Sequence, residues 1–222
     1  MSGTPEQHGM NAEREAIDTL SGEVELDLPE FDAPPGDPLE LLSGWLEAAA
    51  EHGVREPRAL ALATTGVDGA PSSRIVLLKR VDRGLVFTSH HRSRKGRDLA
   101  AAPWAAATLY WRETRQQINF EGTVERLGEA ESDALFAARP PAAQAAALVS
   151  RQSQPLEDPE ELRAAAAEAA GRGAPLSRPR DWGGYRLAPL RIEFWHGSPD
   201  RLHRRLLYTE ETAGWTHQRL QP

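Results

Sequence analysis

Basic side chains are concentrated in one short part of a chain that is acidic as a whole. The 222 residues include 33 acids and 26 Lys or Arg, which gives a formal net charge of −7. Between positions 74 and 97 the balance is reversed, because Asp82 is the only acid there. The basic residues of this segment are Arg74, Lys79, Arg80, Arg83, Arg92, Arg94, Lys95 and Arg97. Guanidinium and ammonium groups gathered in this way are suited to binding a phosphate or carboxylate, although most charge runs are only solvated faces.

Two elements are expected to position these cations. The run Arg74-Ile75-Val76-Leu77-Leu78-Lys79 is β-branched and apolar between two basic residues, which predicts a buried strand with a charge at each end. Ser93 is a suitable N-cap for a short helix over residues 93–101. Free backbone N–H groups at the start of such a helix favour an anion.

The acidity of the chain is concentrated in its first 35 residues. They contain nine acids and only Arg14 as a base, a net charge of −8, which leaves +1 for the rest. We expect residues 1–35 to form a mobile arm, with partial order against the body or a partner as the alternative. Residues 36–222 are expected to form one domain. A near-neutral body with one compact basic patch favours a small anionic ligand over nucleic acid.

Composition narrows the cellular setting. The chain has no cysteine, so disulfides and thiolate metal sites are excluded. No apolar run approaches the roughly 20 residues that a membrane span needs, and the polar N-terminal sequence has no signal-peptide core. We therefore expect a cytoplasmic protein without membrane contact.

Hydrophobic periodicity predicts a mainly β protein with flanking helices, of the α+β class. Asp37-Pro38 begins a helix that should stop at Gly53, and residues 129–172 are alanine-rich and helical. Strands are expected over residues 59–65, 72–80, 85–89, 104–111, 116–127, 183–187, 190–195, 201–208 and 215–220. Gly122 inside one of them predicts a bulge or a close approach. Short strands with Gly-containing turns favour an antiparallel sheet that closes into a barrel.

Several common kinds of active site are absent from the sequence. It has no H-E-x-x-H, G-x-S-x-G, Walker or G-x-G-x-x-G motif. His90 and His91 are adjacent on a predicted strand and point to opposite faces, so we expect no metal site. On the predicted strand 201–208, Arg201, His203 and Arg205 share one face and would repel one another without an anion. A charged edge strand explains the same pattern equally well.

From Trp45 to the C-terminus the sequence resembles the pyridoxamine 5′-phosphate oxidase family of FMN-binding split β-barrels. The motifs that carry the resemblance are Arg74–Lys79, Ser93-Arg94-Lys95, Gln152-Ser153, Trp182-Gly183-Gly184, Ile192-Glu193-Phe194-Trp195, Arg201-Leu202-His203 and Arg219-Leu220-Gln221-Pro222. Their order and spacing agree with the family. The resemblance implies an oxidase that uses O2 and produces H2O2, and a homodimer with FMN at the subunit interface.

The resemblance also implies which residues form the site. FMN contacts fall on Arg74, Ile75, Val76, Leu77, Leu78, Lys79, Thr88, Ser89, Arg94, Lys95, Gln117, Gln152, Ser153, Trp195 and Arg205. Substrate contacts fall on Lys79, Arg139, Arg201 and His203, and the catalytic roles on Arg201 and His203. Arg201 would pair with a substrate carboxylate, and His203 would relay a proton.

Two departures from the family bear on the substrate. Where the vitamin B6 oxidases hold the substrate phosphate with a tyrosine and a serine, this chain has Leu135 and Ala143. The segments 55–64 and 109–114 resemble the phenazine-biosynthesis branch, whose members oxidise reduced, carboxylated tricyclic precursors. We therefore expect an FMN-dependent oxidase late in phenazine biosynthesis. The alternatives are a vitamin B6 phosphate oxidase and a non-catalytic flavin-binding protein.

Overall fold

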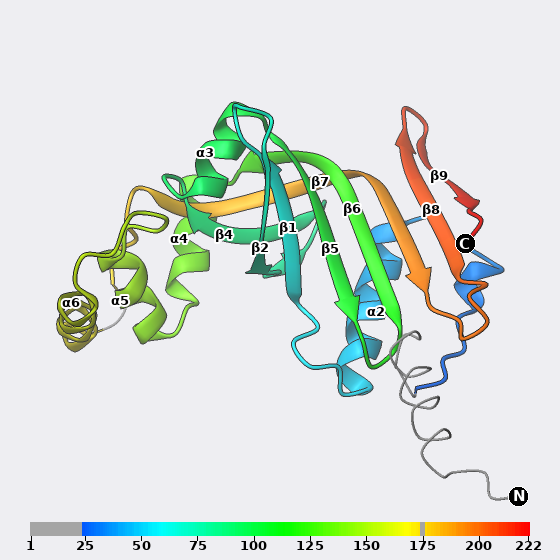
Figure 1. Cartoon of the computed structure of the whole chain (residues 1–222), viewed down its shortest axis with the longest axis horizontal. Coiled ribbons are helices and arrows are strands. Elements are labelled where there is room, and N and C mark those ends of the chain that lie inside the picture. Colours follow the sequence, from blue (N-terminus) through cyan, green and yellow to red (C-terminus); the bar gives the residue numbers. More distant parts are fainter. Residues whose placement is uncertain (1–23, 174–175) are drawn as a thin grey trace, which may run out of the picture. The chain divides into compact units, whose positions relative to one another are not determined.

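The protein is described from a computed structural model, which covers residues 24–173 and 176–222 (Figure 1). Within these residues, nine strands form one sheet in the order β2-β1-β5-β6-β7-β4-β3, with β8 paired to β7 and β9 paired to β8. The strands are β1 Ala59–Thr65, β2 Pro71–Leu77, β3 Arg80–Val81, β4 Leu85–His90, β5 Trp104–Trp111, β6 Gln116–Arg126, β7 Trp182–His196, β8 Arg204–Glu211 and β9 Gly214–Arg219. The pairs β3–β4, β4–β7, β7–β8 and β8–β9 are antiparallel, as the sequence predicts.

Helices precede β1 and occupy several of the segments between later strands. They are the 3-10 helix η1 Pro29–Phe31 and the α-helices α2 Pro38–Glu51, α3 Arg94–Ala101, α4 Glu129–Ala137, α5 Pro141–Val149 and α6 Pro159–Gly171. The Asp37 carboxylate accepts from the Leu39 N–H at 2.8 Å and caps α2, and Gly53 has a φ of +71° just after its end. Local capping chemistry therefore sets these bounds. None of the helices in the described parts of the chain is long and apolar enough to cross a membrane.

The chain divides into two compact units. The first consists of Met1–Ala59, Thr108–Phe120 and Leu190–Pro222, and the second of Leu60–Ala107 and Glu121–Pro189. Strands β5, β6 and β7 contribute residues to both units. The expectation of one domain over residues 36–222 stays a prediction.

Aromatic side chains form the core of the first unit. The Trp45 ring packs edge-on against Phe194 at 5.0 Å, and Phe194 packs against Tyr208 at 5.9 Å. Phe31 is 2% exposed and lies 6.2 Å from Trp45, so the end of the predicted arm is packed. Nearby, the Tyr208 hydroxyl donates to the Pro35 carbonyl at 2.9 Å. Residues 24–35 are thus ordered against this unit, and residues 1–23 lie outside the described part.

The second unit contains a close backbone approach. A Cβ on Gly122 would lie 2.0 Å from the Ala188 carbonyl oxygen, so β6 can pass β7 only if this residue is glycine. The close approach predicted at Gly122 is therefore confirmed. The same unit holds a stacked pair, Phe87 on Tyr185, with ring centroids 5.4 Å apart.

Three strand predictions are wrong in part. The predicted strand 72–80 is divided, because β2 ends at Leu77 and β3 begins at Arg80. It is also less buried than expected: β2 lies at the edge of the sheet, and Ile75 and Leu77 are 62% and 53% exposed. The two strands expected over 183–195 are one continuous strand, β7.

The strand expected from Arg201 begins only at Arg204. The Asp200 carboxylate accepts from the Ser198 hydroxyl at 2.5 Å and from the Leu202 N–H at 2.9 Å, which closes a turn. Arg201 has a φ of +67°, which an extended strand does not allow. Arg201 and His203 therefore lie in the loop before β8, and the expected common face with Arg205 is wrong.

Candidate functional site

A buried lysine lies at the centre of the basic segment in the second unit. Lys95 is 7% exposed, and its ammonium contacts Ser89 Oγ at 3.1 Å and Gln152 Oε1 at 3.2 Å. Within residues 24–173 and 176–222 it forms no ion pair with a carboxylate. Burial and the nearby charge of Arg74 lower the pKa of Lys95 to about 8. A buried ammonium surrounded by neutral acceptors is stabilised by an added anion.

The Gln152-Ser153 loop closes over the start of α3. The Arg94 N–H donates to Ser153 Oγ at 3.1 Å, and Ser89 Oγ donates to Gln152 Oε1 at 3.1 Å. Ser153 has a φ of +71°, an unfavourable backbone conformation of the kind that clusters at binding sites. Two motifs that are far apart in the sequence, residues 93–95 and 152–153, therefore meet here beside Ser89.

The start of α3 differs from the prediction in one respect. Ser93 is the N-cap and accepts from the Gly96 N–H at 3.2 Å, as expected. The N–H groups of Arg94 and Gly96 are both occupied by serine hydroxyls, however, so they are not free for an anion. Attraction for an anion at this end of α3 comes mainly from side-chain charge.

Arg74 brings a second cation to this cluster. Its guanidinium donates to the Leu62 carbonyl at 3.1 Å and to Thr64 Oγ1 at 2.8 Å. Burial lowers the pKa of Arg74, the Asp98 carboxylate raises it and Arg94 lowers it. Arg74, Arg94 and Lys95 therefore repel one another electrostatically, and a bound phosphate would relieve that repulsion.

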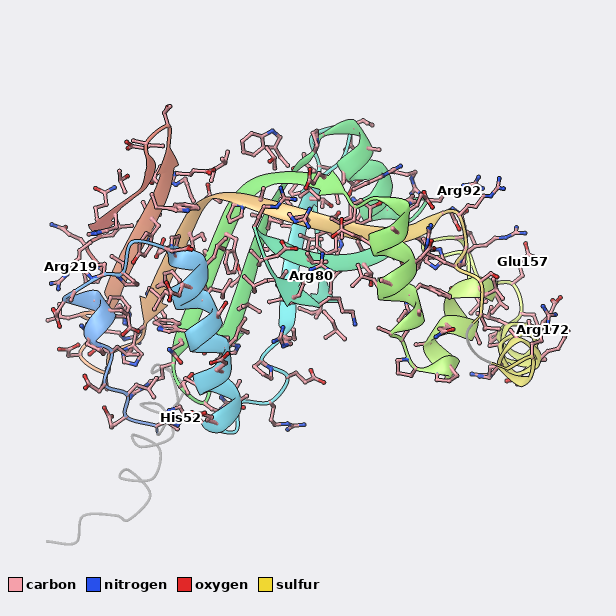
Figure 2. The ribbon with its side chains drawn as sticks, turned by 180° about the vertical axis from the view of Figure 1, so that it is seen from behind. His52, Arg80, Arg92, Glu157, Arg172 and Arg219 are labelled. Carbon is pink, nitrogen blue, oxygen red and sulfur yellow. The ribbon has the colours of Figure 1, made fainter. Side chains whose placement is uncertain are left out.

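Arg80, another basic residue of the segment, is already neutralised. The Arg80 guanidinium, labelled in Figure 2, pairs with Asp82 at 3.0 Å and with Glu131 at 2.5 Å. Arg186 also pairs with Asp82 at 2.8 Å, and these two arginines hold the pKa of Asp82 well below its usual range. This ionic network joins β3, α4 and β7, so it fixes the surroundings of Lys79 and does not bind the anion.

A cavity of about 640 Å³ lies beside the cation cluster in the second unit. Lys79, Thr88, Ser89, Gln152 and Arg139 give it polar walls. Its apolar walls come from Leu77, Leu135, Ala138, Pro140, Ala143, Ala146, Ala147 and Trp182. Six predicted cofactor or substrate residues of this unit therefore line one space, together with Leu135 and Ala143; the six are Leu77, Lys79, Thr88, Ser89, Gln152 and Arg139.

Arg139 is the candidate substrate cation of this cavity. Its guanidinium lies 5.0 Å from the centroid of the Trp182 ring, and burial lowers its pKa. In the described part of the chain no carboxylate pairs with it. Gln144 Nε2 donates to the Arg139 carbonyl at 2.9 Å, and so fixes the turn between α4 and α5.

His90 also belongs to this region, although sequence reasoning did not select it. It is 6% exposed and lines both the cavity above and a neighbouring one of about 750 Å³. Arg92, which projects outward in Figure 2, lines that neighbouring cavity. The Nδ1 atom of His90 lies 3.7 Å from Asp181 Oδ2, which is too far for a hydrogen bond. Burial lowers the pKa of His90. No motif marks this residue, because only burial distinguishes it.

His91 has a hydrogen-bonding partner of its own. Its Nδ1 lies 2.7 Å from the Tyr185 hydroxyl. Among the residues that the structure describes, no group of His, Asp and Glu side chains is arranged to hold a metal ion.

The first unit contains the remaining predicted site residues. The Trp195 and His203 rings are 4.8 Å apart, and Gln117 is half-buried in β6. The Ser198 N–H donates to His203 Nδ1 at 3.1 Å, so the proton of a neutral imidazole lies on Nε2. In this state His203 offers a donor and has no free acceptor, which argues against the predicted proton relay.

Arg205 is already paired. Glu193 holds it through two contacts of 2.7 and 3.0 Å, and its third nitrogen donates to the Gln221 carbonyl at 3.0 Å. The exposed Arg201, in contrast, forms no ion pair among the described residues. The expected mutual repulsion of cations on β8 is therefore absent, and Arg201 remains available to an anion.

Two family models cover most of the chain. The model described as "Pyridoxamine 5'-phosphate oxidase" matches residues 46–173, and "Pyridoxine 5'-phosphate oxidase C-terminal dimerisation region" matches residues 182–222. The chain belongs to the pyridoxamine 5′-phosphate oxidase family. Membership places it among the oxidoreductases and supports a flavin cofactor. The dimerisation region contains β7, β8 and β9 and supports a homodimer.

Relatives within the family carry two different names. "Dihydrophenazinedicarboxylate synthase" of Pseudomonas chlororaphis is 45% identical over 92% of this chain and 93% of its own length. The protein of the same name from Burkholderia lata is 46% identical over 96% of this chain and 100% of its own length. "Pyridoxine/pyridoxamine 5'-phosphate oxidase" of Rubrobacter xylanophilus is 49% identical over 88% of this chain and 91% of its own length. Identity alone therefore does not decide the substrate.

A solved relative confirms the fold. The crystal structure of PhzG from Burkholderia lata in complex with tetrahydrophenazine-1-carboxylic acid has a TM-score of 0.88 and 47% identity, covering 90% of this chain and all of the other. A pyridoxamine 5′-phosphate oxidase-related, FMN-binding protein of Nostoc punctiforme has a TM-score of 0.67 at 19% identity and shows the fold alone. The predicted FMN-binding split-barrel fold is confirmed.

Proposed function

We propose that the protein is an FMN-dependent oxidase that acts late in phenazine biosynthesis and aromatises reduced, carboxylated phenazine precursors with O2 as acceptor. The observation that carries this proposal is the cavity of about 640 Å³, where Arg139 stacks on Trp182 beside the apolar side chains Leu135 and Ala143. A flat, largely apolar acid matches these walls better than a phosphate ester does.

The cation cluster fits the phosphate of FMN. Lys95, Arg74 and Arg94 would neutralise it through charge-assisted hydrogen bonds, and Ser89, Gln152 and Ser153 would close the pocket. A bound FMN supplies the redox chemistry, in which a hydride leaves the substrate and the electrons pass to O2 to give H2O2. By family membership we also assign FMN contacts to Thr88, Gln117, Trp195, Arg205 and the run 75–79.

Arg139 and Lys79 would hold a substrate carboxylate in this cavity. Two hydroxyl donors that the vitamin B6 oxidases direct at a phosphate are replaced here by Leu135 and Ala143, both of which line the cavity. Hydrogen bonds to a charged group contribute about 1.5–3 kcal/mol each, so their loss disfavours a dianionic phosphate. A planar tricyclic acid, by contrast, gains from the apolar surface of Leu77 and Trp182.

Arg201 and His203 of the first unit would position the substrate. Arg201 is exposed and unpaired among the described residues, so it would bind a second carboxylate. His203 would donate from Nε2, because its Nδ1 accepts from Ser198. Oxidation of the substrate yields an aromatic ring, so orientation contributes more than acid–base catalysis. We further propose that FMN lies at the homodimer interface.

The test is reduction of the purified, FMN-loaded protein under anaerobic conditions. Tetrahydrophenazine-1-carboxylic acid, the ligand of the Burkholderia lata relative, should bleach the visible flavin band, and admission of air should restore it with formation of H2O2. Pyridoxine 5′-phosphate should bleach the band much more slowly. The opposite order of rates would establish the vitamin B6 oxidase alternative, which the 49% identity to the Rubrobacter xylanophilus enzyme favours.

A protein that binds FMN but is reduced by neither compound would be the non-catalytic flavin-binding alternative. A colourless protein that does not take up added flavin would contradict all three functions.

A further inference from the structure

A buried acid lies behind the cation cluster, where a phosphate site has no obvious use for negative charge. Asp98, on α3, is 7% exposed. Its Oδ2 accepts from Thr64 Oγ1 at 2.8 Å and from Ser72 Oγ at 3.2 Å. Both hydroxyls also contact Arg74, whose two terminal nitrogens lie 2.8 Å from Thr64 Oγ1 and 2.5 Å from Ser72 Oγ. Asp98 itself is 3.8 Å from the guanidinium.

The direction of every hydrogen bond in this ring is determined. An ionised carboxylate only accepts hydrogen bonds, a guanidinium only donates them, and a hydroxyl has a single proton to give. Thr64 and Ser72 must therefore donate to Asp98 and accept from Arg74. The hydroxyls cannot rotate away without leaving the Asp98 oxygen or an Arg74 N–H group unsatisfied, so the ring holds Arg74 in one orientation.

The ring leaves one edge of Arg74 free. A guanidinium has five N–H groups, and three of them are used here, by Leu62 O, Thr64 Oγ1 and Ser72 Oγ. The two that remain are the Nε–H and the second N–H of the nitrogen that contacts Ser72, and no other described residue accepts from them. These two groups lie on one side of the planar guanidinium and form the fork that binds two oxygens of a phosphate.

We propose that Asp98 is a positioning residue for the cofactor phosphate: through Thr64 and Ser72 it holds Arg74 with its free edge ready to bind two phosphate oxygens. This inference rests on the proposed binding of FMN. The inference gives a role to the buried Asp98 carboxylate. By Coulomb's law alone this carboxylate would disfavour phosphate binding, because the two negative charges repel each other.

The charge of Asp98 and its positioning of Arg74 predict opposite changes in FMN affinity when Asp98 is replaced by leucine. If only its charge matters, both Asp98→Leu and Asp98→Asn should tighten FMN binding, since each removes a negative charge near the phosphate. If positioning dominates, Asp98→Leu should weaken FMN binding because the hydroxyls lose their acceptor. Asp98→Asn, which keeps a carbonyl acceptor of the same size, should then retain most of the affinity.

Riboflavin provides the control ligand, because it lacks the phosphate. The measurement is titration of the protein, freed of flavin, with FMN and with riboflavin, using the quenching of flavin fluorescence. The wild-type protein should bind FMN more tightly than riboflavin. Asp98→Leu should reduce this preference at least about tenfold and leave riboflavin binding within about twofold, as expected for one charge-assisted hydrogen bond. The loss of affinity must be larger for FMN than for riboflavin, since general damage to the fold would weaken the binding of both ligands.

Thr64→Val supplies an independent test if Asp98→Leu fails to fold. It keeps the side-chain shape and removes one hydroxyl of the ring, so it should reduce the preference for FMN in the same direction. Combined with Asp98→Leu it should add little, because both changes break the same ring. A preference for FMN that survives Asp98→Leu, or Thr64→Val where Asp98→Leu does not fold, would overturn the role of Asp98 alone. A wild-type protein without that preference would instead overturn the proposed FMN site.

Discussion

The guanidinium carbon of Arg139 lies 5.0 Å from the centroid of the Trp182 ring. The contact holds a cation in the wall of an otherwise apolar cavity, without a carboxylate partner in the described part of the chain. A desolvated guanidinium on an aromatic face is stabilised by the ring and still presents its N–H edge to a ligand. Arg139 is therefore placed to recognise an acidic, planar substrate.

Arg139→Ala should raise the KM for a carboxylated substrate by one to two orders of magnitude, about the effect of losing one charged hydrogen-bonding partner. FMN affinity should change little, because Arg139 is not among the residues that contact Lys95. Steady-state kinetics and flavin titration check the two effects separately. Arg139→Lys is the matched control, since it keeps the charge and loses the planar stacking; equal activity of all three proteins would exclude the role given to Arg139.

Lys95 predicts a pH dependence of FMN affinity. Its pKa is lowered to about 8 in the protein without an anion, so the ammonium begins to lose its proton near that pH. A phosphate is dianionic above pH about 6, so its own charge stays constant from pH 7 to 9. The Kd for FMN should therefore increase as the pH rises from 7 to 9. Lys95→Met should bind more weakly and show a flat profile over this range, and a flat wild-type profile would contradict the prediction.

The same shift affects stability with the opposite sign. In the unfolded chain a lysine has a pKa of about 10.4, so between pH 8 and pH 10.4 the unfolded state binds more protons than the folded one. Stability of the flavin-free protein due to this group should therefore rise with pH in that window. Denaturant unfolding of the wild type and Lys95→Met at several pH values isolates the contribution as the difference between the two.

Leu135→Tyr combined with Ala143→Ser should improve turnover of pyridoxine 5′-phosphate. Both positions line the cavity that contains Arg139, so the two hydroxyls would face the same space. Two added hydrogen bonds to a phosphate would lower the KM for this substrate by roughly a hundredfold or more. Leu135→Phe with Ala143 unchanged is the control. It adds the ring without the hydroxyl, so it should not improve turnover of the phosphate ester.

Arg201→Ala should reduce kcat/KM by at least about a hundredfold, as expected for loss of a residue that orients the substrate. Bound FMN should be unaffected. The neighbouring Leu202 is 68% exposed, and Leu202→Ala is a control in the same loop. Wild-type turnover by Arg201→Ala would show that the free guanidinium of this loop has no part in the reaction.

Gly122→Ala should destabilise the fold. The new Cβ would lie 2.0 Å from the Ala188 carbonyl oxygen and 2.7 Å from Pro189 Cα, both of them backbone atoms that cannot move alone. Overpacking of this kind costs about 1–3 kcal/mol, which would lower the Tm by several degrees. Gly128→Ala is the matched control, since a Cβ there meets nothing within 4 Å. Equal melting temperatures for the two variants would contradict the close approach.

Local chemistry was readable from the sequence. Asp37-Pro38 predicts the start of α2, Ser93 predicts the N-cap of α3, and the alternation of apolar residues predicts most of the strands. These features depend on side chains within a few residues of one another, so the pattern alone decides them. Family motifs added the residues of the candidate site, and the structure brings most of those in the second unit to one cavity and one cation cluster.

Tertiary structure decided how those residues are used. Glu193 neutralises Arg205 across paired strands, and the turn at Asp200 removes Arg201 and His203 from β8. Asp98 forms hydrogen bonds with hydroxyls of β1 and β2 that also bind Arg74. Asp98 and Thr64 are 34 residues apart, and no periodic signal relates them. Composition and spacing determine which charges the chain carries, but strand register and helix placement determine which partner each charge meets. Those contacts depend on long-range packing, which a local pattern does not contain.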